Sequence, residues 1–146
     1  MNISVIIPTY NRISAVLEFI KYLENEVNPL CSIIVIDQSD NQDNKIHFKR
    51  FQENPNIHYF QQEEKGTGKA RNFGALQTDS EWLCFLDDDV RPSLGYFDGF
   101  EDIVFNNSWV DVIQPDLLQR DEWKNYQASP KDWLRNYIQR QSMIRE

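Results

Sequence analysis

The sequence predicts an α/β protein with a Rossmann-like, three-layer α/β/α architecture and a mostly parallel sheet. Short apolar runs, typical of strands buried on both faces, alternate with segments whose apolar residues recur at helical spacing. This alternation implies parallel strands joined by right-handed crossovers. The length of 146 residues and the 40% of hydrophobic residues suffice for one domain with a real core.

Residues 3–51 supply two strands and two helices of this pattern. An apolar run over 3–7, stopped by Pro8, predicts the first strand. One apolar face predicts the helix that follows, and it is made of Ile13, Val16, Leu17, Ile20 and Leu23. A second buried strand is expected over 33–36, ending at Asp37. A weaker helix is expected over 46–51.

Three further strands and two helices complete the pattern. A turn at 54–56 precedes a third strand over 57–60, and a glycine-rich loop runs into a helix that ends near Leu76. A fourth strand is expected over 82–86 and a fifth over 110–113. Between these two, a helix is expected to start at Pro92 and Ser93, with an inner face of Leu94, Phe97, Phe100 and Val104.

The composition narrows the classes of function. Fifteen Lys and Arg against 23 Asp and Glu give a net charge of −8, which argues against nucleic acid or an anionic membrane as the main partner. Cys31 and Cys84 lie in apolar contexts, so no disulfide framework is expected. No apolar run reaches the ~20 residues that a membrane span needs. We therefore expect a reduced, cytoplasmic protein.

Polar residues follow three of the predicted strands, at the edge where parallel sheets bind ligands. Asp87, Asp88 and Asp89 would repel one another unless a cation neutralised them, and carboxylates suit Mg²⁺ or Mn²⁺ bridged to a diphosphate. Asp37 could accept from a nucleotide or could cap the next helix, and both interpretations stay open. The same holds for the cationic helix start at Arg71, which is either an anion site or a solvated helix end.

Four stretches of the chain, in this order, resemble the nucleotide-sugar-binding half of a family 2 glycosyltransferase with the GT-A fold. They are SVIIPTYNR (4–12), IIVIDQSDN (33–41), GTGKARNFGA (66–75) and FLDDDVRP (85–92). The resemblance covers roughly 3–115 and implies a donor-binding core over 1–115. Residues 116–146 would then begin the acceptor region or form a helical tail, so most of an acceptor half is expected to be missing.

The resemblance also implies roles for individual residues. Pro8, Thr9 and Tyr10 would line the nucleotide pocket, and Asp37 would hydrogen-bond the base. Arg71 would approach the base or the diphosphate, and Gly74 would let its helix pack closely on the sheet. Asp87 and Asp89 match the Asp-x-Asp motif, so Asp87 would lie near the ribose and both would hold the metal. Asp88 fills the variable middle position of that nucleotide-sugar site.

The implied reaction is transfer of a sugar from a nucleoside diphosphate, with UDP favoured, to a glycan or lipid-linked acceptor. It would be inverting and would depend on Mn²⁺ or Mg²⁺. The resemblance implies bacterial polysaccharide or glycolipid assembly in the cytoplasm, with peripheral association at the inner face of the membrane. The catalytic base stays unassigned, because Asp116, Asp121 and Glu122 come earlier than the family's base. The alternative is a binding module that is non-catalytic or truncated and needs a partner for the acceptor half.

Two other classes fit the sequence less well. A nucleotidyltransferase would carry a glycine-rich loop directly after the first strand, where this chain has Pro8 to Arg12 without a glycine. A phosphoacceptor receiver domain would carry its acidic pair after the first strand, and here the acidic triplet follows the fourth.

Overall fold

The computed structural model describes residues 2–26, 31–51, 54–93 and 95–114. Its elements follow one another as strands alternating with helices. They are β1 (Ile3–Thr9), α1 (Ile13–Glu26), β2 (Ser32–Asp37), the 3₁₀ helix η1 (Gln42–Phe51), β3 (Ile57–Gln61), α2 (Thr67–Ala75), β4 (Trp82–Phe85) and α3 (Tyr96–Asn106).

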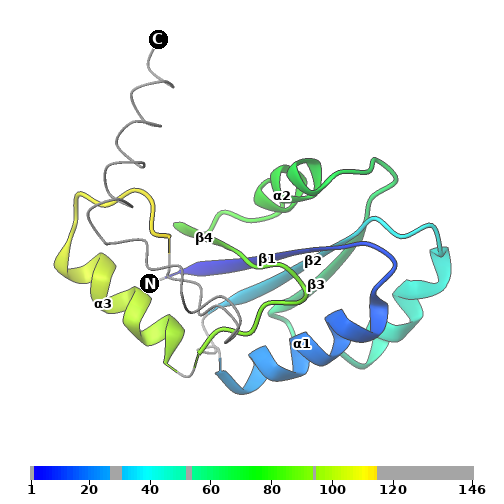
Figure 1. Cartoon of the computed structure of the whole chain (residues 1–146), viewed down its shortest axis with the longest axis horizontal. Helices are drawn as coiled ribbons and strands as arrows, with labels where there is room; N and C mark the ends of the chain where they lie inside the picture. Colours follow the sequence, from blue (N-terminus) through cyan, green and yellow to red (C-terminus); the bar gives the residue numbers. More distant parts are fainter. Residues whose placement is uncertain (1, 27–30, 52–53, 94, 115–146) are drawn as a thin grey trace, which may run out of the picture. The chain divides into compact units, whose positions relative to one another are not determined.

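The four strands form one parallel sheet in the order β3-β2-β1-β4. Alternate residues of β1 pack into different cores, so that Val5 belongs to one face and Ile6 to the other. The larger core holds side chains from α1, η1 and α3, whereas Ala70 of α2 packs on the opposite face (Figure 1). The expected three-layer arrangement with a mostly parallel sheet is therefore confirmed.

The first strand continues through Pro8, where the sequence predicted its end. Ile6 accepts a backbone hydrogen bond from Leu86, on the side of β4, and Thr9 accepts one from Gln38, on the side of β2. Since these directions alternate along a strand, Pro8 faces the side of β4, beyond the last registered β1–β4 pair at Ile6. The missing N–H of the proline therefore removes no hydrogen bond from the ladder.

Helix α2 lies close to the sheet because its sequence provides a glycine at the contact. A Cβ on Gly74 would lie 2.5 Å from Cγ2 of Ile6 and 3.2 Å from Cγ1 of Ile36. Both isoleucines are buried. The structure thus places Gly74 where the helix needs it for close packing.

Two expectations near the end of the described chain are wrong. Helix α3 begins at Tyr96 and not at Pro92, because Gly95 takes a φ of 74°, which a helix cannot continue through. Leu94 of its expected inner face lies outside the described residues. The apolar run over 110–113 is not a strand. No strand among the described residues pairs with it, and Val112 is 60% exposed. The expected domain division at 115 stays a prediction.

Candidate functional site

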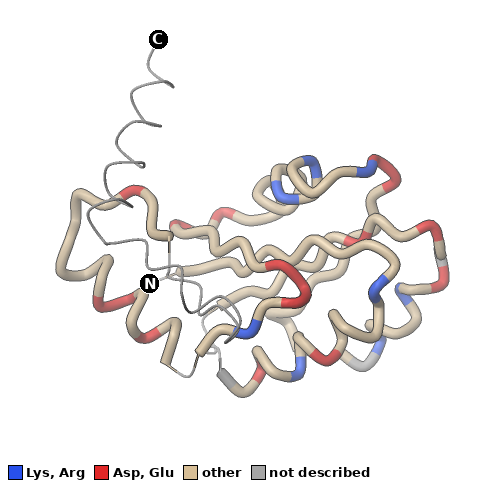
Figure 2. Tube along the Cα trace, viewed as in Figure 1, with Lys and Arg blue, Asp and Glu red and all other residues tan. Residues whose placement is uncertain are grey.

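The ends of β1, β2 and β4 bring the predicted polar residues to one edge of the sheet. The three strands are parallel, so their carboxyl ends share that edge. Figure 2 shows the acidic stretch after β4 at the same end of the sheet as the loops that follow β1 and β2.

Asp88, the middle residue of the acidic triplet, is buried and fixed. Its Oδ2 accepts a 2.7 Å hydrogen bond from Oγ1 of Thr9. Its Oδ1 lies 2.8 Å from Nη1 of Arg12. Thr9 and Asp88 are both 5% exposed, so this carboxylate ties the end of β4 to the end of β1.

The two outer carboxylates of the triplet are open to solvent and each meets an arginine. The side chain of Asp87 is 49% exposed and its Oδ1 lies 2.7 Å from Nη2 of Arg71. The side chain of Asp89 is 61% exposed and its Oδ2 lies 3.1 Å from Nη1 of Arg12. The hydrogen bond to Asp89 and the charge of Asp88 raise the pKa of the Arg12 guanidinium. Two internal cations therefore offset part of the charge of the three acidic side chains, and one negative charge is left over.

Asp87 and Asp89 would hold a divalent ion only together with a substrate that supplies further oxygen ligands. Among the described residues, no three His, Cys, Asp or Glu side chains come together as a metal site. Asp87 and Asp89 offer the hard oxygens that Mg²⁺ and Mn²⁺ prefer, and such ions usually complete their coordination with water and phosphate oxygens. The Nε of Arg71 is buried without a hydrogen-bond partner in this part of the chain. Asp87, Asp89 and Arg71 together thus fit a divalent cation that is bound with an anionic group such as a phosphate.

Asp37 lies at the end of β2 and is completely buried. Its Oδ1 accepts from the backbone N–H of Ser39 at 2.8 Å and from the Ser39 hydroxyl. Its Oδ2 accepts from Asn44 at 2.9 Å and from the hydroxyl of Tyr59 at 2.8 Å. Burial and the neighbouring Asp37 raise the pKa of Tyr59. The carboxylate is directed into the protein and organises the loop that follows β2.

The loop after β1 is held against that same loop. Asn11 has a positive φ of 54°, and its N–H donates to Oγ of Ser39 at 2.7 Å. Pro8 is buried within β1, whereas Tyr10 is 49% exposed. Of these neighbouring residues, Tyr10 is therefore the one that offers a ring to a ligand.

A contact that the sequence analysis missed is made by Gln38. This residue is 4% exposed and connects β2 to the loop before α2. Its Nε2 donates to the carbonyl of Glu64 at 2.6 Å, and its Oε1 accepts from the N–H of Gly66 at 3.0 Å. The polar residue directly after a buried strand was the available signal.

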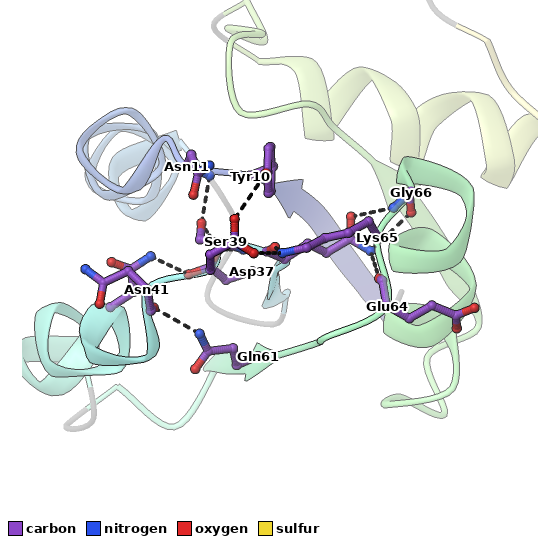
Figure 3. Close-up of polar contacts among 12 residues, drawn as sticks. Tyr10, Asn11, Asp37, Ser39, Asn41, Gln61, Glu64, Lys65 and Gly66 are labelled. Atoms are coloured by element: carbon purple, nitrogen blue, oxygen red, sulfur yellow. Dashed lines mark hydrogen bonds and ion pairs between the residues drawn. The ribbon is translucent and has the colours of Figure 1, made fainter.

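Lys65 in the loop before α2 was missed as well. Its Nζ lies 2.7 Å from Oδ1 of Asp40 and 4.9 Å from the ring centroid of Tyr10 (Figure 3). The hydrogen bond and charge of Lys65 lower the pKa of Asp40. Nothing in the spacing of these three residues indicated that they would meet.

A cavity of about 430 Å³ lies elsewhere, at η1 and β3. None of the predicted site residues lines it. Its lining consists of Lys45, Phe48, Phe51, Ile57, Tyr59 and Gln61. The cavity nevertheless adjoins Asp37, because Tyr59 in its lining donates to that carboxylate. No helix within the described ranges has the length and apolarity to cross a membrane.

Comparison with known proteins gives relatives that share this part of the chain. A protein of Rickettsia bellii named as a glycosyltransferase is 32% identical over 87 residues, covering 60% of this chain and 13% of that protein. The GalNAc(5)-diNAcBac-PP-undecaprenol beta-1,3-glucosyltransferase of Campylobacter jejuni is 34% identical over 90 residues, covering 60% of this chain and 29% of that enzyme. This chain thus spans less than a third of either relative.

Solved structures show the same fold. S. aureus TarS 1–349 in complex with UDP-GlcNAc matches with a TM-score of 0.65 and 22% identity, over 86% of this chain and 39% of that one. The mannosyltransferase PcManGT of Pyrobaculum calidifontis, in complex with GDP-Man and Mn²⁺, matches with a TM-score of 0.57 and 19% identity, over 64% of this chain and 29% of that one. The model of the family "Glycosyl transferase family 2" matches residues 4–100, and the chain therefore belongs to glycosyltransferase family 2.

Proposed function

We propose that this chain is the donor-binding part of a glycosyltransferase that moves a sugar from a nucleoside-diphosphate sugar to an acceptor hydroxyl. The proposal depends most on the 2.7 Å contact between Arg71 and Asp87, where the end of β4 meets α2. This contact supports a site in which Arg71 would meet the diphosphate and the exposed Asp87 and Asp89 would hold a divalent ion. Membership of the family supports the same activity.

The nucleoside would bind at the ends of β1 and β2. The exposed ring of Tyr10 provides a face on which a base stacks, beside the buried Pro8 and Thr9 that shape the floor. Because the Asp37 carboxylate is buried, we propose that it acts on the base site indirectly. It accepts from the hydroxyl of Ser39, whose oxygen in turn accepts from the N–H of Asn11. These contacts hold the two loops at a constant separation.

The diphosphate would bind between α2 and the acidic triplet. Asp87 and Asp89 would hold Mn²⁺ or Mg²⁺, and Arg71 would turn from Asp87 toward a phosphate oxygen. The bound ion would offset the negative charge that develops on the departing diphosphate. Asp88 would stay with Thr9 and Arg12 and keep its two neighbours directed outward.

The acceptor would be a glycan or a lipid-linked sugar, and transfer would invert the anomeric centre. An inverting reaction needs a carboxylate to take the acceptor proton. Asp116, Asp121 and Glu122 lie outside the described residues, and the base stays unassigned. The undecaprenol in the name of the C. jejuni relative supports a lipid-linked acceptor. With such an acceptor, this chain would act at the inner face of the membrane.

A second candidate is a nucleotide-sugar-binding module that depends on a partner chain for the acceptor half. The contacts of Arg71, Asp87 and Asp89 concern the donor alone, so they support the module as well. Release of UDP from UDP-sugars, measured with and without added acceptor, separates the two candidates. Turnover by the chain alone supports the enzyme, and binding without turnover supports the module.

The donor site is tested by thermal unfolding with UDP, GDP or dTDP, each with and without Mn²⁺. We expect at least one nucleotide to raise the unfolding midpoint, and more so with Mn²⁺. Asp89→Ala should lose the Mn²⁺-dependent part, whereas Asp79→Ala, in an exposed position after α2, should keep it. Absence of any shift would refute donor binding, and a full Mn²⁺ effect in Asp89→Ala would refute the metal site.

A further inference from the structure

Three loops meet in a cluster that we call the Lys65 clasp, formed by Tyr10, Gln38, Asp40 and Lys65. Nζ of Lys65 lies 2.7 Å from Oδ1 of Asp40 and also donates to the carbonyl oxygen of Gln38. The hydroxyl of Tyr10 donates to Oδ2 of Asp40 at 3.2 Å. Figure 3 shows Lys65 reaching from the loop before α2 toward Tyr10 and the loop after β2. The clasp therefore includes the ring on which the nucleoside base would stack.

The arms of the clasp are exposed, whereas its support is buried. The side chains of Lys65 and Asp40 are 45% and 71% exposed, and Gln38 is 4% exposed. An exposed ion pair contributes little to stability, so a ligand can separate its partners at low cost. The bonds from Gln38 to Glu64 and Gly66 keep the loop of Lys65 in place when this happens.

The ammonium group of Lys65 lies where it could reach the edge of a base stacked on Tyr10. Nζ lies 4.9 Å from the ring centroid of Tyr10, over the ring, and the lysine stem has enough rotatable bonds to move to the edge of a base. There, Lys65 offers donors only, and the ionised Asp40 offers acceptors only. The base would therefore meet a donor and an acceptor side by side.

This pair distinguishes bases by their hydrogen-bonding edges. Uracil and thymine present a carbonyl acceptor next to a ring N–H donor, and guanine presents the same pair. Cytosine and adenine present the opposite pattern, an amino donor next to a ring nitrogen that accepts. Lys65 and Asp40 are complementary to the first pattern. In the second pattern Lys65 would face the amino donor and Asp40 the accepting ring nitrogen, so neither could form a hydrogen bond.

We propose that Lys65 and Asp40 read the base of the donor nucleotide and select a base with a carbonyl next to a ring N–H over cytosine and adenine. Lys65 donates to the carbonyl oxygen, and Asp40 accepts from the ring N–H. The inference rests on the proposed function, because it requires a nucleoside stacked on Tyr10.

Titration calorimetry with UDP and CDP, each in the presence of Mn²⁺, tests this inference. The two ligands differ only at the edge of the base. We expect the wild-type chain to bind UDP roughly tenfold more tightly than CDP. Lys65→Ala should bring the two Kd values to within about twofold, because the donor to the carbonyl is lost. Asp40→Asn should narrow the difference as well, since its amide can donate to the ring nitrogen of cytosine.

Lys69→Ala is the matched control, because Lys69 stands in the same segment but pairs with Glu64. It removes the same charge and should leave the ratio of the UDP and CDP affinities unchanged. Equal binding of UDP and CDP by the wild-type chain would overturn the inference while leaving the donor site intact. So would an equal loss of both affinities in Lys65→Ala, with the ratio retained. If neither nucleotide binds, donor binding itself fails, and base reading fails with it.

Discussion

Thr9 donates from Oγ1 to Oδ2 of Asp88 over 2.7 Å, joining two residues that are 79 positions apart in the chain. Both are 5% exposed, and Arg12 contacts the other oxygen of the same carboxylate. The middle residue of the acidic triplet is thus an anchor between β1 and β4. Its fixed position leaves Asp87 and Asp89 on the solvent side.

Thr9→Val should lower the free energy of unfolding by about 2 kcal/mol, because a buried carboxylate loses a hydrogen bond. Urea denaturation measures this effect. Thr9→Ser keeps the hydroxyl and loses one methyl group, so we expect a loss of about 1 kcal/mol or less. Equal losses in the two variants would show that the hydrogen bond to Asp88 contributes nothing.

Gly74→Ala should destabilise the protein by about 1–3 kcal/mol through overpacking against the buried Ile6. Gly68→Ala lies in the same helix, and its Cβ would meet no atom within 4 Å. This control should leave stability unchanged or raise it by up to about 1 kcal/mol, since alanine restricts the unfolded chain. Thermal unfolding of both variants checks the difference, and a stable Gly74→Ala protein would contradict the close approach of α2.

Tyr59→Phe should lower the free energy of unfolding by about 1.5–3 kcal/mol, because its hydroxyl is one of the donors that satisfy the buried Asp37. Tyr10→Phe removes a hydroxyl bound to the exposed Asp40 and should change stability by less than about 0.5 kcal/mol. Chemical denaturation of both variants provides the comparison. A Tyr59→Phe protein as stable as the wild type would argue against a structural role for Asp37.

Stability should fall at alkaline pH because of a buried thiol. Burial raises the pKa of Cys84 from 9.0 to about 11. The thiol is neutral in both states below pH 9, so its contribution is complete there. Above that pH the unfolded chain releases its proton first, and stability is lost as the pH approaches 11.

We expect a loss of about 1 kcal/mol between pH 8 and pH 10 from this group. Urea denaturation at several pH values measures it, and Cys84→Ala should show a smaller loss over the same interval. Part of the loss should remain in that variant, because burial also raises the pKa of Cys31. An identical pH dependence in the variant would mean that Cys84 does not titrate differently on folding.

Much of the fold was predictable because local patterns and the sheet agree. The apolar runs before Asp37 and before Asp87 became β2 and β4, and the turn at 54–56 is closed by a hydrogen bond from Ile57 to Asn54. The boundaries were less predictable. Pro8 is tolerated only because its neighbour strand has already ended there, and this depends on the register of β1 and β4.

The site was predictable in its location but not in its internal contacts. Strand ends indicated the edge where Asp37 and the triplet lie, yet the carboxylate of Asp37 is directed inward by donors from three elements of structure. The meeting of Asp40 with Lys65 depends on how two loops fold across a sheet. Contacts between loops produce no periodic pattern in a single sequence, so they could not be predicted from it.

The hydrogen bonds of Gln38 have a consequence for how this site could diversify. The side chain of Gln38 binds the main-chain carbonyl of Glu64 and the main-chain N–H of Gly66, and neither group belongs to residue 65. Residue 65, between them, can therefore be exchanged without loss of the loop's anchorage. A lineage could substitute the residue that we propose to read the base while inheriting the same scaffold, so that ligand preference would evolve faster than architecture.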